Sequence, residues 1–358
     1  MEALTRLRER MGKDGIDAIL VSDPINVGWL TGFSGTFGRV IVTQSDSLFI
    51  TDSRYVIQAR EEVLDHQTVS FGSPTDGDVF ISQQATNLGL KAIGFEAATT
   101  TYAQWQRTTA KMSGIELIPV ADIFSDLRMK KSAKEIEKIK VACGIADAGF
   151  EHICRMIQPG VTEYDICLDL EFFMRRQGAD IAFPSIVVSG ERSARPHGKP
   201  SEKKLEIGDF VTMDFGARVD GYNSDITRTV VVGEASDRHR EVYAAVLEAQ
   251  LGSLDAIRAG VRARDVDGNS RAILAKYDLA QYFGHGLGHG LGRVVHDGGR
   301  LSATSDNIIE PGQIWTIEPG VYIEGFGGVR IEDDVLITEA GIEILTHSPK
   351  ELLILPAA

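Results

Sequence analysis

Cysteine is scarce in this chain of 358 residues, and the few thiols present lack the spacing of a zinc site. The three cysteines are Cys143, Cys154 and Cys167, and no two of them form a C-x-x-C pair. An odd number also argues against a disulfide framework. We therefore expect reduced, structural thiols of the kind found in cytoplasmic proteins.

Long apolar runs and an excess of positive charge are missing as well. No uninterrupted apolar stretch approaches the roughly 20 residues of a membrane span, and the N-terminal segment has no apolar signal core. The 51 acidic residues outnumber the 37 Lys and Arg, which gives a net charge of −14. Such a surface argues against nucleic acid and anionic membranes as partners, and a cytoplasmic location is expected.

The chain contains no low-complexity segment and no short-period repeat, but its character changes along its length. The first part alternates helical patterns with apolar strand-like runs at 17–22, 40–43, 47–51 and 92–95, which predicts an α/β domain. After it, Ser132 and Glu135 form a capping box that begins a helix. We place the two domains at residues 1–127 and 128–358.

The second domain is dominated by strand patterns separated by glycine-rich turns. Two helices, over roughly 237–259 and 263–275, interrupt the strands and favour an α+β fold with a mainly antiparallel sheet. The predicted strands are 186–189, 210–215, 227–232, 313–317, 329–332 and 335–338.

Four carboxylates and one imidazole in this domain are candidate metal ligands. Three of the acids lie within or at the end of apolar strands, where an isolated charge is costly unless it is paired or bound to a cation. Four carboxylates and an imidazole suit two divalent ions, with carboxylates that bridge them. The five residues are Asp214, Asp225, His289, Glu318 and Glu332.

Each candidate also has an ordinary structural interpretation. Asp225 could cap a turn in Asn-Ser-Asp, and Glu332 could pair with Arg330 on a strand. The segment 284–292 is rich in glycine but lacks the Gly-Lys-Ser/Thr of a phosphate loop. A metal-dependent phosphoesterase would need cations near the site, and Arg293 and Arg330 are the candidates. Only the joint pattern points to a metal centre.

The ordered set of five ligands, together with Gly284–Gly292, Glu318-Pro-Gly320 and Arg330-Ile-Glu332, resembles the M24 pita-bread metallopeptidases. The segment Asn26–Phe33 resembles their creatinase-like N-terminal domain. The resemblance implies an α+β pita-bread catalytic domain preceded by an α/β creatinase-like domain. It also implies hydrolysis of the bond before proline, by a dipeptidase (prolidase) in preference to an aminopeptidase P. A non-catalytic binding protein of the same fold is the remote alternative.

The resemblance assigns roles to individual residues. Asp214 would hold one metal, His289 and Glu318 the other, and Asp225 and Glu332 would bridge both. Glu318 would also take a proton from the attacking water. The catalytic set further includes His197, His285, His296 and Arg330.

The remaining expectations concern ligands and assembly. Two divalent ions per subunit are expected, with Mn²⁺ favoured and Co²⁺ or Zn²⁺ as alternatives. The partners would be short proline-containing peptides, and the enzyme would be a homodimer. Arg293 replaces a commonly apolar family position, and we hypothesise that it pairs with a substrate carboxylate.

Overall fold

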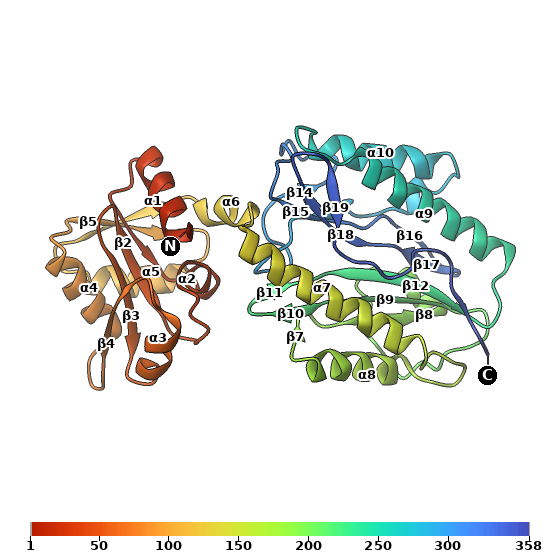
Figure 1. Ribbon diagram of the computed structural model, residues 1–358, viewed down its shortest axis with the longest axis horizontal. Helices are drawn as coiled ribbons and strands as arrows, with labels where there is room; N and C mark the ends of the chain where they lie inside the picture. The colour runs from red at the N-terminus through yellow and green to blue at the C-terminus, as the bar shows by residue number, and fades with distance from the viewer. Residues whose placement is uncertain (1, 358) are drawn as a thin grey trace. The chain divides into compact units, whose positions relative to one another are not determined.

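The computed structural model describes residues 2–357, which form two compact units, one up to Arg128 and one from Met129 onward (Figure 1). No helix in this part of the chain is both long and apolar enough to cross a membrane. Each unit has its own hydrophobic clusters, as expected for a chain of this length.

The first unit is built on a six-stranded mixed sheet with the order β4-β3-β2-β1-β5-β6. β1 pairs with β2 in antiparallel and with β5 in parallel orientation. The strands are β1 (Ala18–Val21), β2 (Arg39–Thr43), β3 (Ser47–Asp52), β4 (Gln67–Phe71), β5 (Ala92–Glu96) and β6 (Glu116–Val120).

Helices cover both faces of this sheet, because successive side chains of a strand point to opposite faces. Ile19 and Val21 of β1 pack in one cluster with Leu7 of the first helix, whereas Ala18 and Leu20 pack in another with Ile81 of the fourth. The helices are α1 (Glu2–Asp14), α2 (Pro24–Thr31), α3 (Val56–Glu62), α4 (Gly77–Asn87), α5 (Tyr102–Lys111) and α6 (Ile123–Met129).

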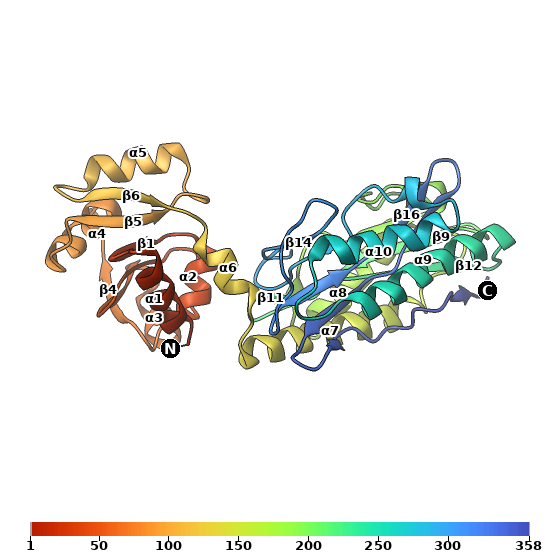
Figure 2. The same cartoon turned by 90° about the horizontal axis from the view of Figure 1, so that it is seen from above.

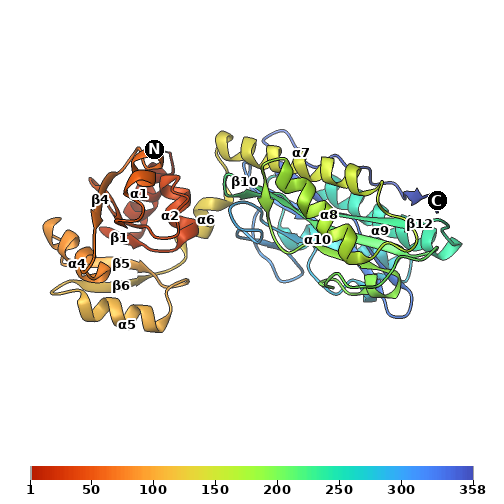
Figure 3. The same ribbon diagram turned by 90° about the horizontal axis from the view of Figure 1, so that it is seen from below.

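The second unit places its strands between two pairs of helices. Helices α7 (Ala133–Ile153) and α8 (Glu163–Arg176) lie on one side of the strands, and α9 (Asp237–Ala256) and α10 (Ala263–Ala275) lie on the other (Figure 1). Figure 2 shows α9 beside α10, and Figure 3 shows α7 beside α8. The capping box predicted at Ser132 and Glu135 is confirmed at the start of α7.

The two helix pairs are an internal repeat that the sequence patterns did not reveal. Pro159-Gly-Val161 precedes α8, and Ala259-Gly-Val261, one hundred positions later, precedes α10. Both glycines have positive φ angles, 91° at Gly160 and 86° at Gly260, which side-chain-bearing residues rarely adopt.

The central strands are mainly antiparallel, in several short sheets rather than one. One sheet has the order β20-β12-β9-β8 and another the order β15-β18-β19. The bounds are β8 (Ile186–Ser189), β9 (Phe210–Phe215), β12 (Ile226–Val232), β15 (Ile314–Ile317), β18 (Asp333–Ile337), β19 (Ile342–Ile344) and β20 (Ile354–Leu355).

Short hairpins complete the unit and carry part of the site. They are formed by β13 (Gly288–His289) with β14 (Arg300–Leu301), and by β16 (Gly320–Ile323) with β17 (Gly327–Arg330). A three-stranded sheet contains β7 (Asp180–Ile181), β10 (Ala217–Val219) and β11 (Tyr222–Asn223). Two 3-10 turns, η1 (Gly190–Ala194) and η2 (Ala280–Tyr282), lie between these elements.

The prediction of a strand over 329–332 was wrong at its end. The strand β17 stops at Arg330, and Glu332 lies in the two-residue break before β18. The reason is a change of partner, because the Glu332 backbone N–H donates to the Thr227 carbonyl oxygen of β12. The chain thereby leaves one hairpin and carries the Glu332 side chain towards the start of β12.

Candidate metal centre

Five separate segments bring the predicted ligands to one cavity of about 930 Å³ in the second unit. Asp214 belongs to β9, Asp225 immediately precedes β12, and His289 ends β13. Glu318 follows β15, and Glu332 lies between β17 and β18. The volume is within the roughly 300–1,000 Å³ typical of small-molecule sites.

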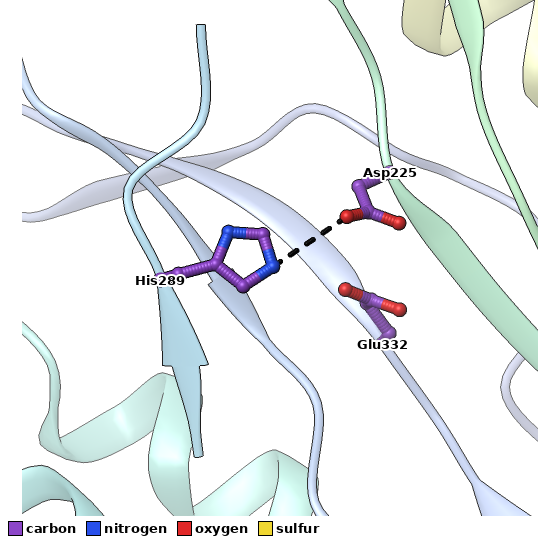
Figure 4. Close-up of side chains that lie close together, drawn as sticks. All are labelled: Asp225, His289 and Glu332. Carbon is purple, nitrogen blue, oxygen red and sulfur yellow. Dashed lines mark ion pairs between the residues drawn. The ribbon is translucent and has the colours of Figure 1, made fainter. Parts of the chain in front are cut away.

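The tightest group in this cavity consists of Asp225, His289 and Glu332. One potential ligand atom from each of them lies within 4.8 Å of the others. The His289 Nε2 atom is 3.6 Å from Asp225 Oδ2 and 3.4 Å from Glu318 Oε1. Figure 4 shows the imidazole pointing at the Asp225 carboxylate, with Glu332 beside it.

A glycine makes this approach of strands possible. A Cβ atom on Gly288 would lie 2.0 Å from the Thr316 carbonyl oxygen, which is far inside van der Waals contact. Position 288 therefore has to lack a side chain for β13 to lie against β15. The Thr316 hydroxyl in turn accepts a hydrogen bond of 3.1 Å from the His289 backbone N–H and fixes the ligand strand.

The carboxylates of the centre are crowded and almost inaccessible to water. Asp225 is 4% exposed and Glu332 is 1% exposed. Burial, followed by the neighbouring Glu332, raises the pKa of Asp225 well above its usual range. Burial, followed by Glu318 and Asp214, does the same to the pKa of Glu332. Arg330 contributes one positive charge to this group of four acids, so the remaining negative charge requires a bound cation or protonation.

Two further observations fit a cation site. The Asp214 Oδ1 atom is buried and has no hydrogen-bond donor among residues 2–357, although most buried polar atoms in proteins have one. Burial, followed by the nearby His296, lowers the pKa of His289 to about 3, so its imidazole is neutral. Its Nδ1 lies 3.1 Å from the Gly290 carbonyl oxygen, which fixes the tautomer with a free lone pair on Nε2. The residues present therefore fit a divalent metal.

The ordinary interpretations of two ligands do not hold in the structure. Glu332 forms no ion pair with Arg330, whose Nη2 atom instead lies 2.6 Å from Asp214 Oδ2. The Asp225 carboxylate caps no turn in the described residues, and its backbone N–H donates to Asp334 Oδ2 at 2.9 Å. Neither side chain has the ordinary role, and both carboxylates are available to bind a metal.

Arg330 organises the acids directly and through a hydroxyl. Its Nε atom donates to the Thr227 Oγ1 atom at 2.9 Å, and the Thr227 hydroxyl donates to Glu332 Oε2 at 2.5 Å. The same guanidinium donates to Asp214, so one buried cation orients two of the candidate ligands. This is the type of support that fixes metal-binding carboxylates in position.

The three predicted histidines outside the ligand set also line the cavity. His285 Nδ1 lies 2.8 Å from the Gly286 carbonyl oxygen, and its Nε2 atom lies 2.9 Å from the Tyr322 hydroxyl. Burial, followed by Arg330, lowers the pKa of His285 to about 4. The His296 ring packs edge-on against the His289 ring, with 4.2 Å between the ring centroids, and His197 lies on the wall of the same cavity.

Arg293 is the one predicted site residue that the structure does not bring to the cavity. Its guanidinium lies over the Tyr222 ring, 5.1 Å from the centroid, and it is not among the residues that line the cavity. The Tyr222 hydroxyl donates to Glu135 of α7, so the stack belongs to the packing of that region.

Sequence reasoning missed three residues of the site. Thr227 lies two positions after Asp225, and Tyr322 lies four positions after Glu318. In an extended chain such residues share a face with the ligand, and this spacing could have revealed them. Arg300 lines the cavity because it pairs with His289 across the β13–β14 hairpin. A pairing of two-residue strands has no signal in the sequence.

Comparison with known proteins agrees with this geometry. The pattern of Metallopeptidase family M24 matches residues 137–339, and that of the Creatinase/Prolidase N-terminal domain matches residues 4–130. The Xaa-Pro dipeptidase of Pyrococcus furiosus is 37% identical over 98% of this chain and 99% of its own length.

Solved structures give the same result. A Bacillus anthracis Xaa-Pro dipeptidase superposes with a TM-score of 0.95 at 44% identity, covering 99% of both chains. A Thermotoga maritima X-Pro aminopeptidase superposes with a TM-score of 0.91 at 37% identity, covering 96% of this chain and 99% of its own. The pita-bread fold with a creatinase-like N-terminal domain is thereby confirmed, and the chain belongs to metallopeptidase family M24.

Proposed function

We propose that this protein is a dinuclear metal-dependent Xaa-Pro peptidase that acts mainly on dipeptides. The observation that carries the proposal is the convergence of four carboxylates and a neutral imidazole in one cavity lined by three further histidines. Full-length relatives named as Xaa-Pro dipeptidases support the choice of substrate. Four carboxylates to one imidazole is a donor set that suits Mn²⁺.

Each ligand has a distinct place in the proposed centre. Asp214 would hold one ion, His289 and Glu318 the other, and Asp225 and Glu332 would bridge the two. When bound, such ions acidify a water and polarise the carbonyl of the scissile peptide. The protein contributes a water-poor site in which Arg330 and Thr227 keep two of the carboxylates fixed.

Glu318 is suited to accept the proton of the attacking water. Its carboxylate lies at the cavity beside the His289 imidazole, and the Thr316 hydroxyl donates to its Oε1 atom at 3.2 Å, which fixes its orientation. His197, on the cavity wall, would donate to the carbonyl oxygen as negative charge develops there.

A series of hydrogen bonds from Arg330 through Tyr322 to His285 would help to position the substrate. Arg330 Nη1 donates to the Tyr322 hydroxyl at 2.7 Å, and that hydroxyl donates to His285 Nε2 at 2.9 Å. This order of donors keeps His285 neutral and fixed at the cavity wall. His285 and His296 would then contact the proline side of the peptide.

A comparison of peptides that differ only at the second residue tests the proposal. Metal-loaded enzyme should hydrolyse Leu-Pro and not Leu-Ala, and removal of the metal with EDTA should abolish the reaction. Equal turnover of the two dipeptides would contradict the proline assignment. Turnover that survives in metal-free protein would contradict the metal mechanism.

Arg300 supports the preference for dipeptides. It lies opposite His289 across the hairpin, so the two side chains share a face, and it lines the cavity. It forms no ion pair with a carboxylate among residues 2–357, and at the cavity wall a guanidinium with free donors binds a carboxylate strongly. We propose that it binds the C-terminal carboxylate of the dipeptide, the role that the sequence suggested for Arg293.

Arg300→Met is therefore expected to lower kcat/KM for Leu-Pro by about 10- to 100-fold, the range for loss of a charged hydrogen bond. The rate with Leu-Pro-amide should stay within about twofold, because the amide offers no carboxylate for the guanidinium. Arg293→Met is the matched control and should change neither rate. An unchanged Leu-Pro to Leu-Pro-amide ratio in Arg300→Met would contradict the assignment, and a changed ratio in Arg293→Met would restore the original hypothesis.

Metal identity, assembly and location complete the proposal. We propose Mn²⁺ as the physiological ion, a homodimer as the assembly and the cytoplasm as the location. The donor set supports the first, and the family resemblance and the amino-acid composition support the others. Light scattering coupled to gel filtration measures the subunit number directly, and a monomeric mass would contradict the dimer.

A further inference from the structure

A second cavity, of about 110 Å³, lies within the first unit and has no part in the metal centre. It is lined by the residues that follow β1, by Thr99 and Thr100 beyond β5, and by Trp105 of α5. A single water needs roughly 10–15 Å³ of such space. The cavity therefore has room for a small molecule of several atoms.

The position of this cavity in the sheet is one where α/β proteins bind ligands. β1 and β5 are parallel neighbours, so their carboxyl ends lie at the same edge. From β1 the chain continues to β2 on one side, and from β5 it continues to β6 on the other. Ligands of open α/β sheets bind in the crevice formed where the strand order reverses in this way.

Arg39 places a guanidinium on the cavity wall that forms no direct ion pair with a carboxylate in the described residues. As the first residue of β2, antiparallel to β1, it lies at the carboxyl end of β1. Among residues 2–357 its side chain donates to the Gly38 carbonyl oxygen at 2.8 Å and lies over the Phe37 ring, 5.0 Å from the centroid. Burial lowers the pKa of the guanidinium, and the carboxylates of Asp78 and Glu96, which lie further away than an ion pair, partly offset this effect.

The other charged residues of the cavity wall form interactions with neighbouring groups, and one carboxylate oxygen among them has no partner among residues 2–357. Arg107 Nε lies 3.1 Å from Asp78 Oδ2, so these two compensate each other. Asp23 uses its Oδ1 atom to accept the backbone N–H groups of Ile25 and Asn26 at the start of α2. Its Oδ2 atom accepts no hydrogen bond within the described residues and remains able to accept one.

We propose that this cavity binds a free amino acid. Its carboxylate would take the unused donors of Arg39, and its ammonium group would donate to Asp23. The apolar part of the ligand would rest against Trp105 and the side chains of Leu20 and Leu117. One molecule that carries both charges a short distance apart satisfies both groups at once. The inference does not depend on the peptidase activity.

Calorimetric titration of metal-free, full-length protein with L-alanine tests the proposal. Saturable binding is expected in the wild type, with affinity about 10- to 100-fold weaker in Arg39→Gln, the range for loss of a charged hydrogen bond. Arg54→Gln is the matched control, since Arg54 of the same unit is exposed and pairs with Asp52 outside the cavity. Its affinity should equal that of the wild type.

Additional arms separate the alternatives. Arg39→Lys keeps the charge and should bind L-alanine with intermediate affinity. This variant provides the test if circular dichroism shows that Arg39→Gln does not fold. Arg300→Gln should bind as the wild type does, because Arg300 lines the other cavity. No saturable binding, binding unaffected by both Arg39 variants, or tighter binding of inorganic phosphate than of L-alanine would each overturn the proposal.

Discussion

Glu318→Gln is expected to lower kcat for Leu-Pro by about 10²–10⁴-fold, the usual contribution of a general base. The carboxylate lies 3.4 Å from the His289 Nε2 atom within the centre, and the amide cannot accept the proton of the attacking water. The measurement is proline release under saturating dipeptide, with bound metal counted in the same sample by mass spectrometry.

The matched control for this variant is Glu324→Gln. Glu324 is exposed in the turn between β16 and β17, six positions after Glu318, and should keep wild-type activity. Loss of turnover in Glu318→Gln with much of the metal retained would assign the effect to proton transfer. Wild-type turnover in Glu318→Gln would remove Glu318 from the proposed mechanism.

Asp225→Asn is expected to remove most of the bound metal and most of the activity. Asp225 would bridge both ions, and a neutral amide is a weaker ligand that cannot offset their charge. The fold should survive, because Asp225 holds its place through a backbone N–H that donates to Asp334 Oδ2 at 2.9 Å. Equilibrium dialysis against Mn²⁺, followed by metal analysis, gives the affinity directly.

Asp220→Asn provides the comparison for this second variant. Asp220 lies five positions earlier on an exposed turn, with a φ of 48° that asparagine adopts readily. Its metal content and turnover should match the wild type. If Asp225→Asn bound Mn²⁺ as tightly as the wild type does, Asp225 would not be a ligand.

Elements whose pattern depends on local contacts could be predicted from the sequence. Ser132 and Glu135 cap α7 with reciprocal hydrogen bonds between neighbours three positions apart. The strands β8 and β9 were predicted with their observed bounds, because each is an apolar run buried in a sheet. Such signals are complete within a few residues.

Features that depend on distant contacts could not be predicted in the same way. Glu332 leaves the strand pattern because its backbone N–H bonds to Thr227, which lies 105 positions away along the chain. Arg293 seemed suited to a substrate carboxylate from its position near His289 and His296, yet it packs on Tyr222. Arg300, seven positions later, lines the cavity because the two-residue strands β13 and β14 pair with each other.

The metal centre could be predicted from the sequence only in part. The acidic residues Asp214, Glu318 and Glu332 lie within or beside apolar strand patterns, where a charge needs compensation. Their positions therefore predicted bound cations on physical grounds. The convergence of all five ligands, however, was an expectation from family resemblance until the strands brought them to one cavity. Spacing in sequence contains no information about that convergence.

The decisive measurement is proline release by metal-free and Mn²⁺-loaded enzyme from matched Xaa-Pro dipeptides and Xaa-Pro-Yaa tripeptides. Cleavage is expected to require the metal and to be confined largely to the dipeptides. Metal-dependent cleavage of the tripeptides would instead establish an aminopeptidase P. No cleavage of either class with Mn²⁺, Co²⁺ or Zn²⁺ would contradict the assignment of this cavity as an Xaa-Pro peptidase site.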